Sequence, residues 1–161
     1  MIYTIGHSNI TPEAFIEILK TFKIQLVMDV RSSPYSKFVP HFNRENLKIT
    51  LNDNDIKYIF IGHQIGGKPK DKKYYQDGKV NYDLIAETDH FKEGINKIIE
   101  LNKDNDLVLM CSEEDPYNCH RHHLITQTLI KNGLEVVHIR KNCKMDKITE
   151  TDKRDVQMTL L

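Results

Sequence analysis

Short apolar runs alternate with amphipathic segments along this chain. The run Leu107–Met110 consists of four consecutive apolar residues, which is typical of a strand buried on both faces of a parallel sheet. Similar short runs predict five strands, at residues 2–5, 25–30, 58–61, 107–110 and 135–139. Between the strands, apolar residues recur at helical spacing, and the first such stripe consists of Phe15, Ile18, Leu19 and Phe22.

Capping residues mark the ends of the predicted helices. Thr11-Pro12 places a hydroxyl at the N-cap and a proline at the first helical position. Asn132-Gly133 is suited to end a helix that begins after Cys119. Two further helices are predicted, one capped by Asn43 and one around residues 91–99. This alternation predicts an α/β fold with three layers, in which a parallel or mostly parallel five-stranded sheet carries helices on both faces.

The same pattern predicts the domain organisation. Residues 1–140 are expected to form a single α/β domain, with a long loop rich in glycine and lysine from about residue 62 to 81. Residues 141–161 are highly charged and are expected to be a C-terminal extension, either a short helix or partly disordered.

Composition narrows the class of protein. The chain has 161 residues, 39% of them hydrophobic and 29% charged, which fits a folded domain with a real core. The 23 basic and 23 acidic residues cancel, so the net charge does not favour nucleic-acid binding. This composition still allows a local basic groove. No apolar run approaches the roughly 18 residues of a membrane span, and the N-terminus does not read as a signal peptide. Three cysteines without framework spacing suit a reducing compartment, so a cytoplasmic protein with no membrane partner is expected. The sequence predicts neither a cofactor nor an oligomeric state.

Polar residues gather where the predicted strands end. Because the carboxyl ends of parallel strands meet at one edge of the sheet, these residues are expected to form one site. Catalytic roles are predicted for His7, Asp29, Cys119 and His120. Ligand-binding roles are predicted for Ser8, Asn9, Arg31, Ser32, Gly66, Gly67, Cys111, Glu113 and Arg121. Plainer roles remain open, since His7 could cap a turn and Asp29 with Arg31 could be an architectural ion pair.

The first hypothesis for this edge is binding of an anionic ligand. Arg31, Arg121 and a helix N-terminus would hold a phosphate-bearing, nucleotide-like or nucleic-acid ligand. His7, Asp29 or His120 would then transfer protons. An enzyme of this kind would be a hydrolase or a transferase.

The second hypothesis is thiol chemistry. Cys119 lies near a predicted helix start beside His120 and Arg121, all of which favour a thiolate, so it would be a nucleophile or a redox partner of Cys111. Cys111 is followed by acidic residues, including Glu113, which disfavour its thiolate.

Two further hypotheses stay open. Zinc could be held by Cys111, Cys119, and His120 or His123, with His7 as a further donor, but the spacing matches no common zinc module, so no metal ligand is assigned. Alternatively, both cysteines only pack in the core of a non-catalytic interaction module.

One basic and aromatic segment lies outside the site. Lys68–Lys73 is rich in lysine and is followed by Tyr74 and Tyr75. It is interpreted as a solvated loop, a lid over the site, or a contact for nucleic acid.

Five spaced motifs resemble one known family. They are Thr4–Asn9, Asp29–Pro34, Pro40–Asn43, Gly66-Gly67, and Cys111 with Glu113 before Cys119-His120-Arg121. Together they resemble the domain of unknown function 488 family, which includes the YeaO-like proteins, from the first strand to about Ile139. The resemblance implies a compact cytoplasmic α/β domain with the same polar residues, and no defined activity.

A second, weaker resemblance concerns the segment Val27–Arg31. It is similar to the Asp-Val-Arg strand of rhodanese-like domains, and Cys111 has the position of their cysteine at the end of a later strand. The loop after Cys111 departs from that pattern, because it is longer, acidic and without glycine.

Overall fold

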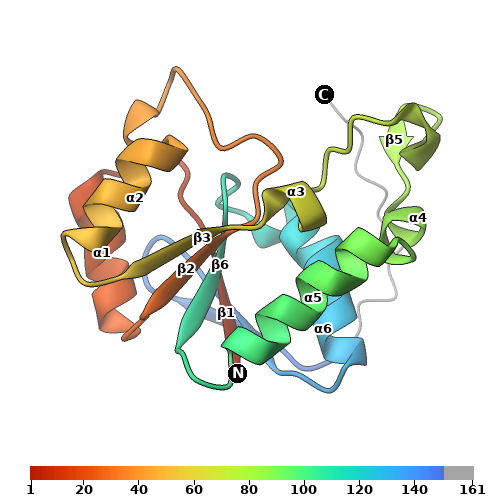
Figure 1. The fold of residues 1–161 in the computed structure, drawn as a ribbon. Helices are drawn as coiled ribbons and strands as arrows, with labels where there is room; N and C mark the ends of the chain where they lie inside the picture. Colours follow the sequence, from red (N-terminus) through yellow and green to blue (C-terminus); the bar gives the residue numbers. More distant parts are fainter. Residues whose placement is uncertain (151–161) are drawn as a thin grey trace.

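The central sheet of the protein has six strands. The computed structural model describes residues 1–150, and Figure 1 shows the sheet with helices on both faces. The strand order is β3-β2-β6-β1-β7-β8. Five strands are parallel: β1 (Ile2–Gly6), β2 (Leu26–Asp29), β3 (Lys57–Phe60), β6 (Leu107–Cys111) and β7 (Val136–Ile139). The predicted α/β class with a mostly parallel sheet is therefore confirmed.

The sixth strand corrects the predicted count of five. β8 (Met145–Ile148) pairs antiparallel with β7, in a segment expected to be a short helix or partly disordered. Met145 and Lys147 are exposed while Asp146 and Ile148 are half-buried, which is the period-two pattern of an edge strand. The high charge of this segment hid that alternation. The rest of the predicted extension, residues 151–161, lies outside the described residues, and the predicted domain boundary stays a prediction.

Each face of the sheet is covered by a pair of helices. α1 (Pro12–Thr21) and α2 (Arg44–Asn52) pack on one face with Val27 and Val108, whereas α5 (Asp89–Leu101) and α6 (Gln127–Lys131) pack on the other. Leu107 and Leu109 point to the second face, so successive residues of β6 enter opposite cores. Burial on both faces explains the uninterrupted apolar runs.

The segment predicted as a long loop is more ordered than expected. It forms α3 (Gly62–Ile65), the 3-10 turn η2 (Lys72–Tyr74), and a small antiparallel sheet of β4 (Tyr75–Gln76) and β5 (Lys79–Val80). Asp77 and Gly78 connect the two strands with φ angles of 52° and 74°, as an Asp-Gly hairpin turn requires. The fold prediction missed this second sheet because its strands are only two residues long.

Three further short elements lead to the site. They are η1 (Pro40–Phe42), α4 (Tyr82–Ala86) and η3 (Pro116–Asn118). The helix predicted after Cys119 begins as a π-helical segment, η4 (Arg121–Thr126), and continues as α6. Thr11 caps α1 as predicted by accepting from the Ala14 backbone, whereas the side chain of Asn43 accepts from the Ser36 backbone and not from α2. Within residues 1–150, no helix combines the length and the apolar content needed to cross a membrane.

The end of β1 passes directly beneath the loop that follows β6. A Cβ atom on Gly6 would overlap the backbone carbonyl of Glu113. We therefore expect Gly6→Ala to lower the free energy of unfolding by about 2–3 kcal/mol, because backbone would have to move. Urea denaturation measures this change. Gly78→Ala is the matched control: nothing lies near its Cβ position, so only the positive φ should cost about 1 kcal/mol. Equal losses in the two variants would show that the crossing is loose.

Candidate functional site

The carboxyl ends of three adjacent strands form the candidate site. β6 lies between β1 and β2, with Gly6 opposite Cys111 and Asp29 opposite Met110. The structure thus brings together the residues that follow these strands. Their chemical roles stay predictions, but their positions separate them into three groups.

The first group is a buried cluster of Cys111, Cys119 and His120. The Nδ1 atom of His120 lies 3.9 Å from Sγ of Cys111 and 3.6 Å from Sγ of Cys119. The three possible ligand atoms all lie within 4.8 Å of one another. His120 Nε2 is 3.1 Å from the carbonyl oxygen of Val30, which can only accept, so Nε2 carries a proton. In the neutral ring, the lone pair of Nδ1 therefore faces the two sulfur atoms.

The charges around the two thiols differ. Burial opposes ionisation of Cys119, but the hydrogen bond from Cys111 and the neighbouring His120 and Arg121 outweigh it, so the pKa of Cys119 is lowered. The hydrogen bond to Cys119 and burial raise the pKa of Cys111. The cluster therefore favours one thiolate, on Cys119, which is the direction expected from sequence. The two thiols also affect Tyr82. Burial of its phenol, and then the negative charge of Cys119 and Cys111, raise the pKa of Tyr82 to about 12.

Of the two glycines predicted for ligand binding, Gly67 lies against this cluster. A Cβ atom on Gly67 would be 2.5 Å from Cβ and Cγ of His120, so only glycine allows this approach. Gly66 lies against Ser32, whose Oγ accepts from the backbone of Lys68 at 2.9 Å. Gly67 thus packs directly on the cluster, whereas Gly66 packs on Ser32.

Arg121 holds the loop between the two cysteines. Its side chain is fully buried and donates to the backbone carbonyls of Glu113 and Glu114, and Nε donates to Oγ1 of Thr4 at 3.2 Å. The Glu113 side chain is exposed. The guanidinium group predicted to bind an anion therefore organises the chain that carries Cys119.

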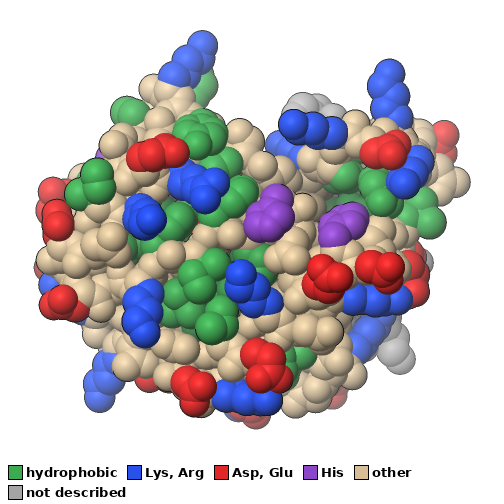
Figure 2. All heavy atoms as spheres, viewed as in Figure 1, with side chains coloured by type: hydrophobic (Ala, Val, Ile, Leu, Met, Phe, Trp, Pro, Cys, Tyr) green, Lys and Arg blue, Asp and Glu red, His purple; other side chains and the backbone are tan. Residues whose placement is uncertain are grey.

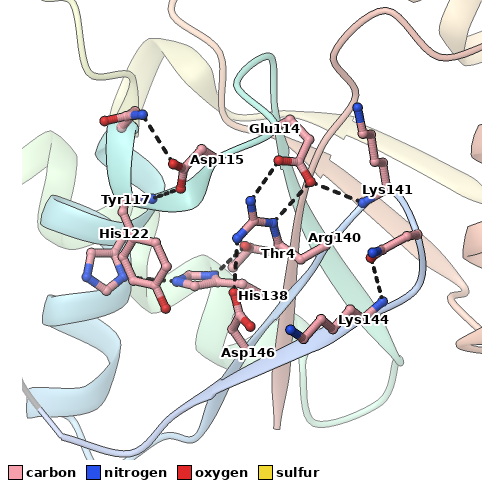
Figure 3. A network of polar contacts seen from close by, with 12 residues as sticks. Thr4, Glu114, Asp115, Tyr117, His122, His138, Arg140, Lys141, Lys144 and Asp146 are labelled. Carbon is pink, nitrogen blue, oxygen red and sulfur yellow. Dashed lines mark hydrogen bonds and ion pairs between the residues drawn. The ribbon is translucent and has the colours of Figure 1, made fainter.

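Two buried histidines continue the polar contacts of Arg121. The Thr4 hydroxyl, which accepts from Arg121, lies 2.7 Å from Nδ1 of His138. Nε2 of His138 lies 2.9 Å from Nδ1 of His122, so one of these two rings donates to the other (Figure 3). Burial, and then Arg121 and His122, lower the pKa of His138 to about 3. Sequence analysis missed His138, although a histidine inside the apolar run Val136–Ile139 signals a buried polar partner.

Figure 3 also shows how Arg140 connects the loop after β6 to the edge strand β8. Arg140 forms two hydrogen bonds with the carboxylate of Glu114, at 3.0 and 2.8 Å, and a third with Asp146 of β8 at 3.2 Å. The paired Arg140 lowers the pKa of Glu114.

The second group joins Asp29, Arg31 and His7. Asp29 accepts from Nε and Nη2 of Arg31 at 2.9 and 2.7 Å, and from the hydroxyl of Tyr58 at 2.6 Å. Nη1 of Arg31 donates to Nε2 of His7 at 3.1 Å, and Nη2 also donates to the carbonyl of Phe42. Burial, then Arg31, lower the pKa of His7 to about 4. In the described chain no hydrogen bond joins this group to the thiols.

The remaining predicted residues lie apart from the cluster. Ser8 is half-buried and Asn9 is exposed, and the Ser8 hydroxyl donates to the Asn9 side chain at 3.4 Å. His7 Nδ1 is bonded to the carbonyl of Ser8, and His123 Nε2 to the carbonyl of Tyr117. Of the histidines considered for zinc, the structure brings only His120 to the two cysteines.

Comparison with known proteins identifies the family. A family model described as "Domain of unknown function DUF488" matches residues 11–128, which is most of the chain. The chain belongs to the DUF488 family. No curated protein and no solved structure matches it. The predicted resemblance to DUF488 is thus confirmed, whereas the similarity to rhodanese-like domains is not supported. The matched residues include the cluster and the Asp29–Arg31 pair, but the family description names no activity.

We expect the protein to lose stability between pH 7 and pH 5. The unfolded chain protonates His7 and His138 near pH 6.5, whereas the folded chain holds their pKa values at about 4 and about 3. The unfolded state therefore binds more protons, and each histidine lowers the free energy of unfolding by up to about 1.4 kcal/mol per pH unit. Urea denaturation at pH 7, 6 and 5 tests the slope, and NMR titration identifies the histidines. An unchanged slope is expected for His90→Gln, which replaces an exposed histidine. Titration of His7 and His138 near pH 6.5 would contradict the assignment.

Proposed function

We propose that the protein is a zinc-dependent hydrolase whose metal ion is held by Cys111, Cys119 and His120. The observation that carries this proposal is the convergence of two buried sulfur atoms and one imidazole lone pair. Thiolate and imidazole are the donors that zinc prefers in proteins.

The spacing of the donors supports a tetrahedral ion. Zinc–sulfur and zinc–nitrogen bonds of about 2.3 and 2.0–2.1 Å place a sulfur and a nitrogen roughly 3.6 Å apart on a tetrahedron. The sulfur–nitrogen distances of 3.6 and 3.9 Å match that edge closely. The hydrogen bond from His120 Nε2 to Val30 is the outer contact that typically orients a metal-binding histidine.

The number of donors supports a catalytic role for the ion. Three protein ligands leave a fourth position for water or substrate, whereas structural zinc sites have four protein ligands. Zinc supplies a Lewis acid and a water of lowered pKa there. Tyr82 packs against the core that includes Cys111 and Cys119, and its phenol is the group that we expect to donate a hydrogen bond to a bound ligand.

A metal-free thiol enzyme is the second candidate. The lowered pKa of Cys119 supports it, because a thiolate stabilised by the hydrogen bond from Cys111 and by the charge of Arg121 is also a nucleophile. The anionic substrate expected from sequence is compatible with either chemistry. It would need cationic partners other than Arg31 and Arg121, whose donors are engaged inside the protein.

Metal binding provides the direct test. The purified chain is expected to bind one equivalent of Zn²⁺, and Co²⁺ should give the intense visible absorption of a tetrahedral thiolate site. Cys111→Ser, Cys119→Ser and His120→Gln should each weaken binding at least tenfold, because each removes one ligand. Cys143→Ser and His123→Gln are the matched controls, since Cys143 is exposed and His123 is bonded elsewhere.

Alkylation separates the two candidates. In the zinc protein, Cys111 and Cys119 should be protected until a chelator is added. The zinc centre would be rejected in favour of the thiol enzyme if Cys119 were labelled equally fast with and without chelator and the protein held no stoichiometric metal.

The close packing of Gly67 gives an independent test of the cluster geometry. Gly67→Ala should displace the His120 ring and lower Co²⁺ affinity about tenfold or more, because metal ligands tolerate little displacement. Far-ultraviolet circular dichroism should remain that of the wild type. Wild-type affinity in a folded Gly67→Ala protein would show that His120 is not a ligand.

A further inference from the structure

Two segments project beyond the edge of the sheet that carries the site. We call residues 33–43 the first arm and residues 66–81 the second arm. They rise on the same side of the molecule, the first in orange and the second in olive and green (Figure 1). Figure 2 shows two projections on this side of the molecule, each with a basic side chain at its tip.

The first arm presents aromatic rings to solvent. Phe38 is 85% exposed and Tyr35 is 55% exposed, although large apolar side chains usually lie inside a fold. The Lys37 ammonium group lies 5.7 Å from the centre of the Phe38 ring. The arm therefore offers an accessible flat ring with a cation beside it.

The second arm is basic. Lys68, Lys70 and Lys72 are exposed and form no ion pair within residues 1–150. Lys73 pairs with Asp71 at 3.5 Å and lies 5.1 Å from the Tyr74 ring. Although the whole chain is neutral, residues 68–73 carry four lysines and one aspartate.

The two arms are joined at their bases. Gly67, at the base of the second arm, packs on His120 of the buried cluster. Ser32, which precedes the first arm, accepts a hydrogen bond from the Lys68 backbone.

We propose that the two arms bind single-stranded nucleic acid, with the lysines of the second arm contacting phosphates and Phe38 stacking on a base. Exposed rings combined with exposed lysines are the recognition elements of sequence-tolerant single-strand binding. An anionic membrane surface would also attract the lysines, but the exposed ring of Phe38 adds a flat surface on which a base can stack, and a lipid headgroup has no such partner. None of the residues proposed to contact nucleic acid is a proposed metal ligand, so this proposal goes beyond the zinc centre and does not depend on it.

Fluorescence anisotropy with labelled oligo(dT) and oligo(U) tests the proposal on the full chain. Saturable binding is expected, and it should weaken as salt rises from about 50 to 200 mM. The triple variant Lys68→Glu, Lys70→Glu and Lys72→Glu should lose at least about tenfold in affinity, and its salt slope should fall by about 2. Phe38→Ala should lose about tenfold at any salt concentration, because stacking is not screened.

Matched controls give these results their meaning. Lys57→Glu, Lys97→Glu and Lys131→Glu together reverse three exposed lysines on β3, α5 and α6, and this variant should bind like the wild type. Equal losses in both triple variants would overturn the proposal, as would an unchanged affinity in Phe38→Ala. Tighter association with phosphatidylserine vesicles than with oligo(dT) would also overturn it in favour of a membrane surface. Each titration is run with and without chelator, so that failure of the metal site is distinguished from failure of the arms.

Discussion

A fully buried guanidinium group must have its hydrogen-bond donors satisfied inside the protein, and the site depends on how Arg121 meets that requirement. Its partners are two backbone carbonyls of the loop after β6 and the hydroxyl of Thr4 on β1. Leaving a buried charged donor unpaired would cost several kcal/mol. The loop therefore has to return over β1, and this return brings Cys119 and His120 back to Cys111 at the end of β6.

The same requirement divides the polar residues of the sheet edge into two sets: those whose hydrogen-bonding groups are satisfied inside the protein, and those whose groups remain available to a ligand. The carboxylate of Asp29 is hydrogen-bonded to Arg31 and Tyr58, and the imidazole of His7 to Arg31 and the Ser8 carbonyl. His138 is hydrogen-bonded to Thr4 and His122. What remains at the centre is a pair of thiols and one lone pair of His120. These are weak hydrogen-bonding groups but strong ligands for a soft metal ion.

The sequence predicted the layers of the fold because strands buried on both faces have no polar face, and this pattern is visible without any knowledge of tertiary contacts. It also predicted that Cys111, Cys119, His120 and Gly67 would come together, since parallel strands end at one edge. It could not show which way side chains point from that edge. Arg31 and Arg121 are residues typical of an anion site, yet both side chains point inward. Arg31 pairs with Asp29, which is the architectural role that the sequence left open. Arg121 contacts two carbonyls and the Thr4 hydroxyl, partners that no local sequence pattern reveals. The strand β8 was hidden for a related reason: an edge strand needs only weak alternation when its partner is already in place.

The contact between Gly67 and His120 has a thermodynamic consequence. The backbone at the base of the second arm and the imidazole ring share one van der Waals boundary, so neither can shift by a few tenths of an ångström without the other. A ligand that displaces the backbone at Gly67 would therefore displace His120 and change the affinity of the cluster for a metal ion. By linkage the effect is reciprocal: occupancy of the cluster changes the affinity of the arm by the same factor. The absence of a side chain at Gly67 thus couples the second arm to the cluster.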